Sequence, residues 1–485
     1  MNEEKTLKKN LWMFPLGTVG RDMVYNLVTN FLLTYILFTK GLSAAQLGAI
    51  TAIMVAARVF DALNDPIMGN IIEMTHTKWG KFKPWLLIGI VLTSGVVSMV
   101  FCSDLKGWDF VILFGVFYFA YSIAYTMHDI SYWGMVPALS SDASARDQIT
   151  SRATLFAGIG GTSASILIPM LTTGATAIGG SANVAYKVVA VAISILSPLF
   201  LCFTLFGASE RREAVKPQKS SGGLKKVFNT LIHNDQLRWI AIIFLIQQVG
   251  NGLVIGGVGS TYIYFTYGYE GGLYSLFTTV GMSATAFLMV FYPAISKRIP
   301  RKKLMNIMAV ISVVGYVMMI ASAVIPSIGF ALLVVGYMLS NFGQYCYYLV
   351  MMISIINTVE YNELKTGTRD EAIIASVRPF MTKMASALIV MITTGSYMLF
   401  GVTKITNQIS DFESAAASGL LSEADKLTNI SSLLSNVEAG QSFGLLMCMT
   451  VLPCALMLIS NAMYQKKYTL DEAEYERILK ELEKR

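Results

Sequence analysis

Four acidic side chains lie in stretches of sequence that are otherwise apolar enough to cross a membrane. They are Asp22, Asp61, Asp65 and Asp129. A carboxylate at the centre of a bilayer costs roughly 2.5 to 3.5 kcal/mol even on lenient insertion scales, so such groups mark ion or substrate paths by default. Their positions indicate the chemistry of an ion-coupled membrane transporter.

The run ARVFDALNDPIMG places Asp61, Asn64 and Asp65 on one face of a helix, because residues three and four apart project together. Two carboxylates and an amide oxygen make a hard site suited to Na⁺, Li⁺ or a proton, without the soft ligands that zinc or copper prefer. The alternative is a structural ion pair with Arg58, three residues before Asp61. We favour the cation site, because one arginine cannot neutralise two acids.

A second polar group follows at Tyr125, Thr126, Asp129 and Trp133, again at helical spacing. A carboxylate, a hydroxyl and an indole could thus face one cavity, an arrangement that suits a saccharide whose hydroxyls and apolar ring face need different partners. Aromatic residues on a span are more often packing or interfacial residues, so Trp133 counts as evidence only through its register with Asp129. His128 points about 100° away from Asp129, which indicates a structural role.

The elements that must position these groups are membrane-spanning helices. Hydrophobic residues make up 54% of the 485 residues and charged residues only 14%, whereas soluble chains carry about a quarter charged residues. Twelve apolar stretches are long enough to cross a core of roughly 30 Å. We expect them at residues 11–39, 44–72, 86–103, 109–138, 153–174, 187–208, 237–266, 273–295, 304–325, 328–359, 373–401 and 441–463.

Lysine and arginine clusters alternate with these stretches and predict the topology. They occur near 5–9, 78–83, 146–152, 211–226, 297–303 and 365–369, which places both termini in the cytoplasm by the positive-inside rule. The net charge of +7 is then a consequence of topology, and no nucleic-acid partner is expected. No cleavable signal peptide is visible, so the first span should act as its own insertion signal.

The basic segment between the sixth and seventh stretches divides the chain into two bundles of six helices. We predict an N-terminal bundle at 1–208, a cytoplasmic linker at 209–236, a C-terminal bundle at 237–463 with an external loop at 402–440, and a tail at 464–485. The sequence T-x-x-E at Thr469 and Glu472 predicts that the tail is a helix. Two-bundle transporters hold their substrate near the midplane between repeats.

The two predicted bundles differ in charge. The first carries acidic residues in its spans, whereas the second carries Arg378 and Lys383 and no clearly buried acid. Cation binding is therefore expected in the first bundle. A buried Arg378 would need an anion, either a carboxylate of the protein or an anionic substrate. We favour a neutral glycoside as the cargo, because a carboxylate of the protein can serve as that partner.

Long motifs carry a resemblance to the glycoside-pentoside-hexuronide:cation symporter family. The runs are DALNDPIMG, TKWGKFKPW, YTMHDISYWGMVPALSSDASARDQITSR and NTVEYNELKTGTRDEAIIASVRPFMTKMASA, and the similarity covers nearly the whole chain. The resemblance implies a major facilitator fold and sugar import coupled to Na⁺, Li⁺ or H⁺. By motif position it implies cation binding by Asp61, Asn64, Asp65 and Thr126, and sugar binding by Asp22, Asp129, Trp133 and Arg152, with Arg21 and Tyr125 nearby and Lys383 between the sites.

The chain departs from the best-known member of that family on the sugar side. Tyr348 stands where a tryptophan is usual, Arg378 and Pro379 replace a glutamine and a threonine, and Ser131 replaces a proline. Coupling chemistry is therefore better supported by the resemblance than the identity of the sugar.

We expect a secondary sugar symporter of a bacterial cell membrane, monomeric, with a monovalent cation and a small sugar or glycoside as its partners and no cofactor. No catalytic constellation is visible, because His76, His128 and His233 lie near no plausible nucleophile and acid. Transport of a lipid-like amphiphile on the same fold is the alternative. A sugar sensor is a third possibility, but it would need a signalling domain that the short tail does not supply.

Overall fold

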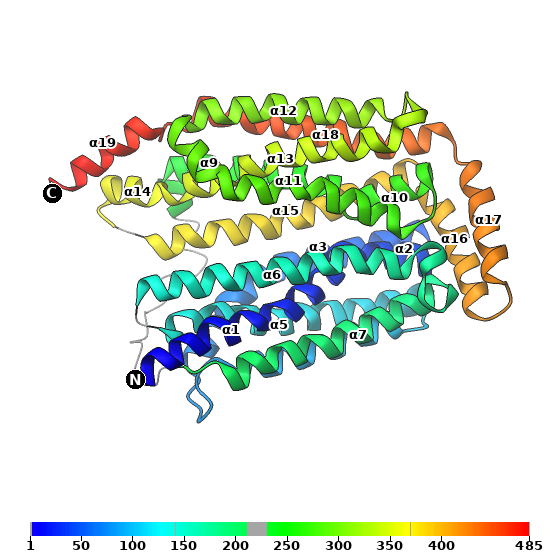
Figure 1. Cartoon of the computed structure of the whole chain (residues 1–485), viewed down its shortest axis with the longest axis horizontal. Coiled ribbons are helices and arrows are strands. Elements are labelled where there is room, and N and C mark those ends of the chain that lie inside the picture. The colour runs from blue at the N-terminus through cyan, green and yellow to red at the C-terminus, as the bar shows by residue number, and fades with distance from the viewer. Residues whose placement is uncertain (1, 141, 211–229, 369, 485) are drawn as a thin grey trace. The chain divides into compact units, whose positions relative to one another are not determined.

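The structure is a computed structural model that describes residues 2–140, 142–210, 230–368 and 370–484 (Figure 1). Within these residues all regular secondary structure is helical, apart from an isolated bridge between Thr77 and Gly80. The predicted all-α fold class is confirmed. Most of the linker predicted at 209–236 lies outside the described residues.

Eleven helical stretches of the described chain are long and apolar enough to cross a membrane. They coincide with the second to twelfth predicted ranges, which confirms a multi-span membrane protein. The first predicted range, 11–39, is helical as well, but it is divided into α1 (Asn2–Asn26), a π-helical segment η1 (Leu27–Phe31) and α2 (Leu32–Thr39). A total of twelve spans and the cytoplasmic termini remain predictions.

The described chain forms two compact units. The first contains the described residues before 211 together with Gly268–Ser275 and Gly401–Val437, and the second contains 230–267, Leu276–Phe400 and the residues from Glu438 onward. This division differs from the predicted bundles at 1–208 and 237–463. Two segments from the second half of the sequence, including most of the predicted external loop at 402–440, belong to the first unit.

Helix α1 is central to the first unit, where it packs along α6 and α7. Small residues make this packing close: a Cβ added to Gly160 of α6 would lie 2.2 Å from the carbonyl oxygen of Val19 on α1. Close backbone approach at glycine is a common way for helices to associate in membranes. The other helices of the bundle are α3 (Ala44–Glu73), α4 (Lys83–Cys102), α5 (Gly107–Leu139), α6 (Ala143–Thr172) and α7 (Ala182–Cys202).

The second unit shows the same small-residue packing, with Gly315 of α12 set against the backbone of Gly336 on α13. Its Gln247, Gln344 and Tyr316 form a buried hydrogen-bonded chain across three helices. The unit contains α9 (Asp235–Val254), α10 (Gly257–Tyr267), most of α11 (Gly271–Arg298), α12 (Arg301–Ala321), α13 (Gly329–Ile356), α14 (Thr358–Thr366), α15 (Glu371–Leu399), α18 (Ala439–Lys467) and α19 (Glu472–Leu482).

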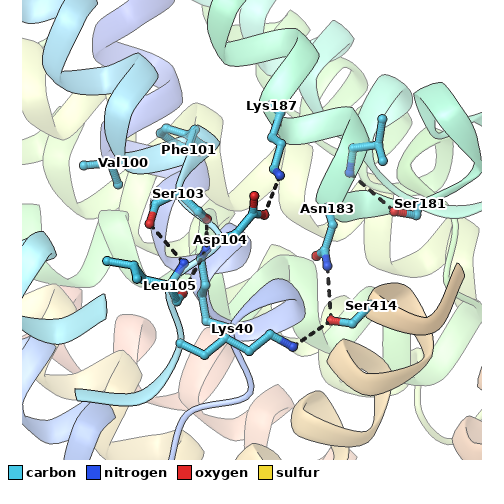
Figure 2. Close-up of polar contacts among 12 residues, drawn as sticks. Lys40, Val100, Phe101, Ser103, Asp104, Leu105, Ser181, Asn183, Lys187 and Ser414 are labelled. Carbon is cyan, nitrogen blue, oxygen red and sulfur yellow. Dashed lines mark hydrogen bonds and ion pairs between the residues drawn. The ribbon is translucent and has the colours of Figure 1, made fainter. Parts of the chain in front are cut away.

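Residues 402–435, within the segment predicted as an external loop, form a hairpin of two helices, α16 (Val402–Ala417) and α17 (Glu423–Ser435) (Figure 1). Helix α16 packs against α2 and α7 of the first unit. Asn183 at the start of α7 donates to Ser414 Oγ at 3.1 Å, and close by Lys187 forms an ion pair with Asp104 (Figure 2). The hairpin is therefore an integral part of the first unit.

A fully buried ion pair joins the two helices of the hairpin. Lys426 Nζ lies 3.5 Å from Glu413 Oε2, and both side chains are 0% exposed. Each also bonds to the chain around the start of α7: Lys426 Nζ donates to the carbonyl oxygen of Gly180 at 2.7 Å, and Glu413 Oε2 accepts from Ala182 N at 2.6 Å. Burial raises the pKa of Glu413, and the charge of Lys426 opposes that rise.

The predicted tail helix is present as α19, but its N-cap is Asp471 and not Thr469. The Asp471 side chain accepts from Glu474 N at 3.0 Å, which satisfies one of the free N–H groups of the first turn. Glu472 instead pairs with Arg301 at the start of α12, at 3.0 Å. This contact holds the start of α19 against the helical body of the second unit.

Candidate functional site

Helices α3 and α5 pack together in the first unit and carry the residues predicted to bind a cation. Ser122 Oγ on α5 donates to Asp61 Oδ1 on α3, and Thr126 Oγ1 donates to Asp65 Oδ1 at 3.3 Å. Ser122 and Thr126 are four residues apart, as are Asp61 and Asp65, so each carboxylate meets one hydroxyl across the helix pair. The structure thus brings Asp61, Asp65 and Thr126 together as predicted.

Arg58, the alternative partner of Asp61, lies in the same cluster. Its Nη1 is 3.6 Å from Asp61 Oδ2, and the two side chains are 14% and 8% exposed. The ion pair that we weighed against a cation site is therefore present. Two carboxylates and one guanidinium still leave one net negative charge, which matches a single monovalent cation.

The ligand chemistry of this cluster is oxygen-based. Asn64 lies between the two aspartates on α3, and its amide nitrogen is buried without a hydrogen-bond partner among the described residues. Nowhere in the described chain do three or more His, Cys, Asp or Glu side chains converge as they would around a transition metal. Carboxylate, amide and hydroxyl oxygens favour a hard cation.

A second charged cluster forms where α1 meets α5. Arg21 Nη2 donates to Asp22 Oδ2 at 2.8 Å, and Arg21 Nη1 donates to Asp129 Oδ1 at 3.1 Å. The arginine side chain is 6% exposed, whereas those of Asp22 and Asp129 are 20% and 39% exposed. Arg21 therefore fixes one oxygen of each acid from within the bundle and leaves each carboxylate partly accessible.

Aromatic rings surround this second cluster. The Arg21 guanidinium lies 5.2 Å from the ring centroids of both Tyr132 and Trp133. The structure thus brings Trp133 to the same cluster as Asp129, through Arg21. Tyr125 stacks on Tyr25 of α1 with ring centroids 5.4 Å apart, so it lies beside these groups as expected.

Two residues of the site, Ser122 and Tyr25, were not identified from the sequence. Ser122 lies four residues before Thr126, so its helical register with a predicted ligand could have found it. Tyr25 lies three and four residues after Asp22 and Arg21, which is a weaker signal because aromatic residues are frequent throughout the spans. His128 is 0% exposed and packs near Tyr132, consistent with a structural role.

Arg152 lies apart from the acids with which it was grouped. Its Nη1 donates to the carbonyl oxygen of Leu11 at 3.4 Å, and its guanidinium lies 4.6 Å from the ring of Trp12. These contacts place Arg152 beside Leu11 and Trp12 of α1, which come before Arg21 in that helix. In this structure Arg152 therefore contacts neither Asp22 nor Asp129.

Three predicted site residues belong to the second unit: Tyr348 on α13, and Arg378 and Lys383 on α15. Arg378 Nη1 donates to Tyr348 Oη at 3.4 Å, and the Tyr348 ring packs against Tyr345 and Phe244. Arg378 is exposed, so the expectation that it is buried is wrong.

The two clusters of the first unit share helix α5. Thr126 belongs to the carboxylate cluster and Asp129 to the Arg21 cluster, and the two residues are three apart. Three residues correspond to roughly 4.5 Å along a helix axis, and they lie on the same face. The two clusters therefore lie within one helical turn of each other on α5.

Comparison with known proteins identifies the family of the chain. The family described as "MFS/sugar transport protein" matches residues 13–472. A lactose permease of Lactobacillus helveticus is 29% identical over 97% of this chain and 71% of its own length. A lactose permease of Leuconostoc lactis is 30% identical over 77% of this chain, which spans 60% of that protein, and a raffinose carrier protein of Pediococcus pentosaceus is 26% identical over 97% and 71%.

Solved structures support the fold. A bacterial homologue of the human lysosomal transporter Spinster aligns with a TM-score of 0.63 at 13% identity, covering 96% of this chain and 98% of that one. A D-xylose-proton symporter aligns with a TM-score of 0.56 at 13% identity, covering 90% and 99%. At this identity the likeness concerns the arrangement of helices alone.

Proposed function

Because the chain belongs to the MFS/sugar transport protein family, we propose that it is a secondary active symporter that imports a sugar or glycoside together with a monovalent cation. The relatives named as lactose permeases and a raffinose carrier support a saccharide as the cargo. Na⁺ is the coupling ion of first choice, with Li⁺ and H⁺ as the alternatives that the same oxygen ligands accept. Alternating access of the two halves moves the cargo.

The observation that carries this proposal is the pair of charged clusters on α5. The cation binds at Asp61, Asn64, Asp65 and Thr126, where the groups carry one net negative charge together with Arg58. The sugar binds at Asp22 and Asp129, whose accessible oxygens accept hydrogen bonds from neighbouring hydroxyls while Trp133 covers an apolar ring face.

Coupling between cation binding and sugar binding follows from helix α5, which both clusters share. A bound cation neutralises the carboxylate cluster and draws Asp65 and Thr126 together, which fixes the α3–α5 contact. Because Asp129 is one turn from Thr126 on α5, the same event orients the sugar-binding carboxylate. Each ligand then strengthens binding of the other, and thermodynamic linkage requires the effect to be equal in both directions.

The cargo that we propose is neutral. Of the two predicted site cations on α15, Arg378 is exposed and already bonds to the Tyr348 hydroxyl. The Asp22 and Asp129 carboxylates of the sugar cluster would repel a uronic acid unless Arg21 released them. Lys383 and Arg152 remain proposed members of the sugar site, and their contribution is tested together with that of the other proposed sugar-binding residues.

Purified protein in liposomes tests the proposal, with radiolabelled galactosides and imposed Na⁺ or H⁺ gradients applied separately. Wild-type protein accumulates sugar under at least one gradient. Asp61→Cys and Asp65→Cys abolish accumulation but retain sugar binding or exchange, because they remove cation ligands alone. Retention of full gradient-driven accumulation by either variant would refute the cation assignment.

Sugar-site variants complete the test. Asp129→Ala lowers sugar affinity by one to two decades, because each charge-assisted hydrogen bond contributes roughly 1.5 to 3 kcal/mol. Asp104→Ala is the matched control, since the Asp104 side chain is 85% exposed and pairs with Lys187, which belongs to neither cluster. Calorimetric titration that gives Asp129→Ala the affinity of the control would move the sugar site elsewhere.

A further inference from the structure

The α16–α17 hairpin is held on the first unit by one face of each helix. Val402, Ile405 and Ile409 of α16 are buried, and Ile430 and Leu434 of α17 are buried at matching intervals. These positions are three, four or seven residues apart, which is the spacing of a single apolar stripe. The apolar surface of the hairpin is thus used in its attachment.

A different set of residues on the two helices lines a groove, and this set is mostly polar. On α16 it contains Gln408, Asp411 and Phe412, and on α17 it contains Asn429, Ser432, Leu433 and Asn436. Five of these seven side chains are polar, and the groove between them has a volume of about 450 Å³.

The polar groups of the groove are available to a ligand. The side chains of Gln408, Asp411 and Asn429 make no hydrogen bond to the part of the chain that the structure describes, and Asn436 bonds only to the carbonyl oxygen of Ser432 in its own helix. Gln408 and Asp411 are exposed, and Phe412 is half-buried. Amides both donate and accept, and a carboxylate accepts twice.

From this lining we infer a second ligand site: the groove between α16 and α17 binds a neutral saccharide. Amide and carboxylate groups match vicinal hydroxyls, and the Phe412 ring offers a surface to the apolar face of a pyranose. The inference concerns a surface separate from the transport site and is argued from the groove alone. Its connection to the transported sugar rests on the proposed function.

The charges of the groove exclude other ligand classes. No lysine or arginine lines it, so a phosphorylated or uronic sugar would meet only the negative charge of Asp411. One carboxylate with neutral amides is a poor match for a divalent cation, which requires several anionic oxygens. A lipid chain would leave five polar side chains without partners.

The buried ion pair makes the groove a preformed site. Glu413 follows Phe412 directly, and Lys426 lies three residues before Asn429, so the pair fixes both walls to the first unit. A site whose walls are already ordered loses less conformational entropy when a ligand binds.

Photolabelling of the intact purified protein tests the inference. The probe is a neutral galactoside with a diazirine on its aglycone, and the readout is mass-spectrometric mapping of labelled peptides. Saturable labelling within residues 402–437 is expected, and an excess of unlabelled neutral galactoside should compete with it, while the matching uronic acid should compete at least tenfold less well.

Variants separate this site from transport. Asn429→Leu with Asn436→Leu should abolish the competed labelling of the hairpin and leave gradient-driven uptake at saturating sugar unchanged. Asp129→Ala should do the reverse, losing uptake but retaining hairpin labelling, so a failure of the proposed transport function is distinguished from a failure of the groove.

Two outcomes overturn the inference: labelling of 402–437 that does not saturate or is not competed, and competed labelling that survives in the double variant. If the double variant were misfolded, uptake would fall as well. In that case Ser432→Trp, which fills the groove from an exposed position, must abolish labelling for the inference to stand.

Discussion

Replacement of Lys426 by methionine should detach the α16–α17 hairpin from the first unit. The variant keeps the length and packing of the side chain but leaves the Glu413 carboxylate at 0% exposure without its cation. Removing one partner of a buried ion pair costs roughly 3 to 5 kcal/mol, because the remaining charge stays desolvated. Lys426 also loses its bond to the carbonyl oxygen of Gly180, which adds an unsatisfied acceptor.

Hydrogen exchange of the hairpin amides measures this loss directly. When exchange proceeds through local opening, its rate rises with the opening equilibrium constant, and a loss of 3 to 5 kcal/mol corresponds to an acceleration of roughly 150- to 5,000-fold. The effect should be confined to residues 402–437 and to the start of α7, where Ala182 N donates to Glu413. Mass spectrometry of proteolytic fragments resolves both regions.

Two further variants give the measurement its controls. Lys404→Met removes an exposed lysine from the same helix and should leave hairpin protection within a few-fold of the wild type. Lys426→Met combined with Glu413→Gln removes both charges and should recover most of the lost protection, because no charge is then left buried. Equal protection in Lys426→Met and Lys404→Met would show that the ion pair does not hold the hairpin.

Three other perturbations have defined outcomes. Gly160→Ala should lower the yield of folded protein by size-exclusion chromatography, whereas Gly158→Ala, whose Cβ meets nothing within 4 Å, should not. Burial lowers the pKa of Lys40 to about 8 despite the opposing charge of Asp104, so the folded state releases this proton at a lower pH than the unfolded state does. The melting temperature of the wild type should therefore rise relative to that of Lys40→Met between pH 7 and pH 9.5. Glu472→Ala removes the ion pair at the start of α19 and should increase proteolysis of the C-terminal tail without loss of uptake.

The proximity of the residues in the carboxylate cluster could be predicted from the sequence because they follow one helical period. Asp61, Asn64 and Asp65 lie within a single turn, so local geometry fixes their common face before any tertiary contact forms. Ser122 was not identified although it lies four residues before Thr126, because a serine on an apolar helix is a weak signal without a known partner. Its role is visible only through the packing of α3 on α5.

Contacts between residues far apart in the sequence were predicted less well. Arg152 was grouped with Asp129 by resemblance, but its contacts with Leu11 and Trp12 depend on how α6 lies along α1, which no local spacing specifies. The hairpin was expected as an external loop because its residues are polar on average. Its pairing of Glu413 with Ala182 spans 231 residues, and such a contact leaves no periodic trace in the sequence.

That long separation has a consequence for the order in which the protein is made. Translation at roughly 5 to 20 residues per second means that Gly180 and Ala182 leave the ribosome tens of seconds before Lys426 and Glu413 exist. During this interval the amide of Ala182 and the carbonyl of Gly180 lack the partners that they have in the finished fold. The first half of the chain therefore inserts into the membrane before its own unit is complete, and a gene fragment that ends in the linker encodes a bundle without its hairpin.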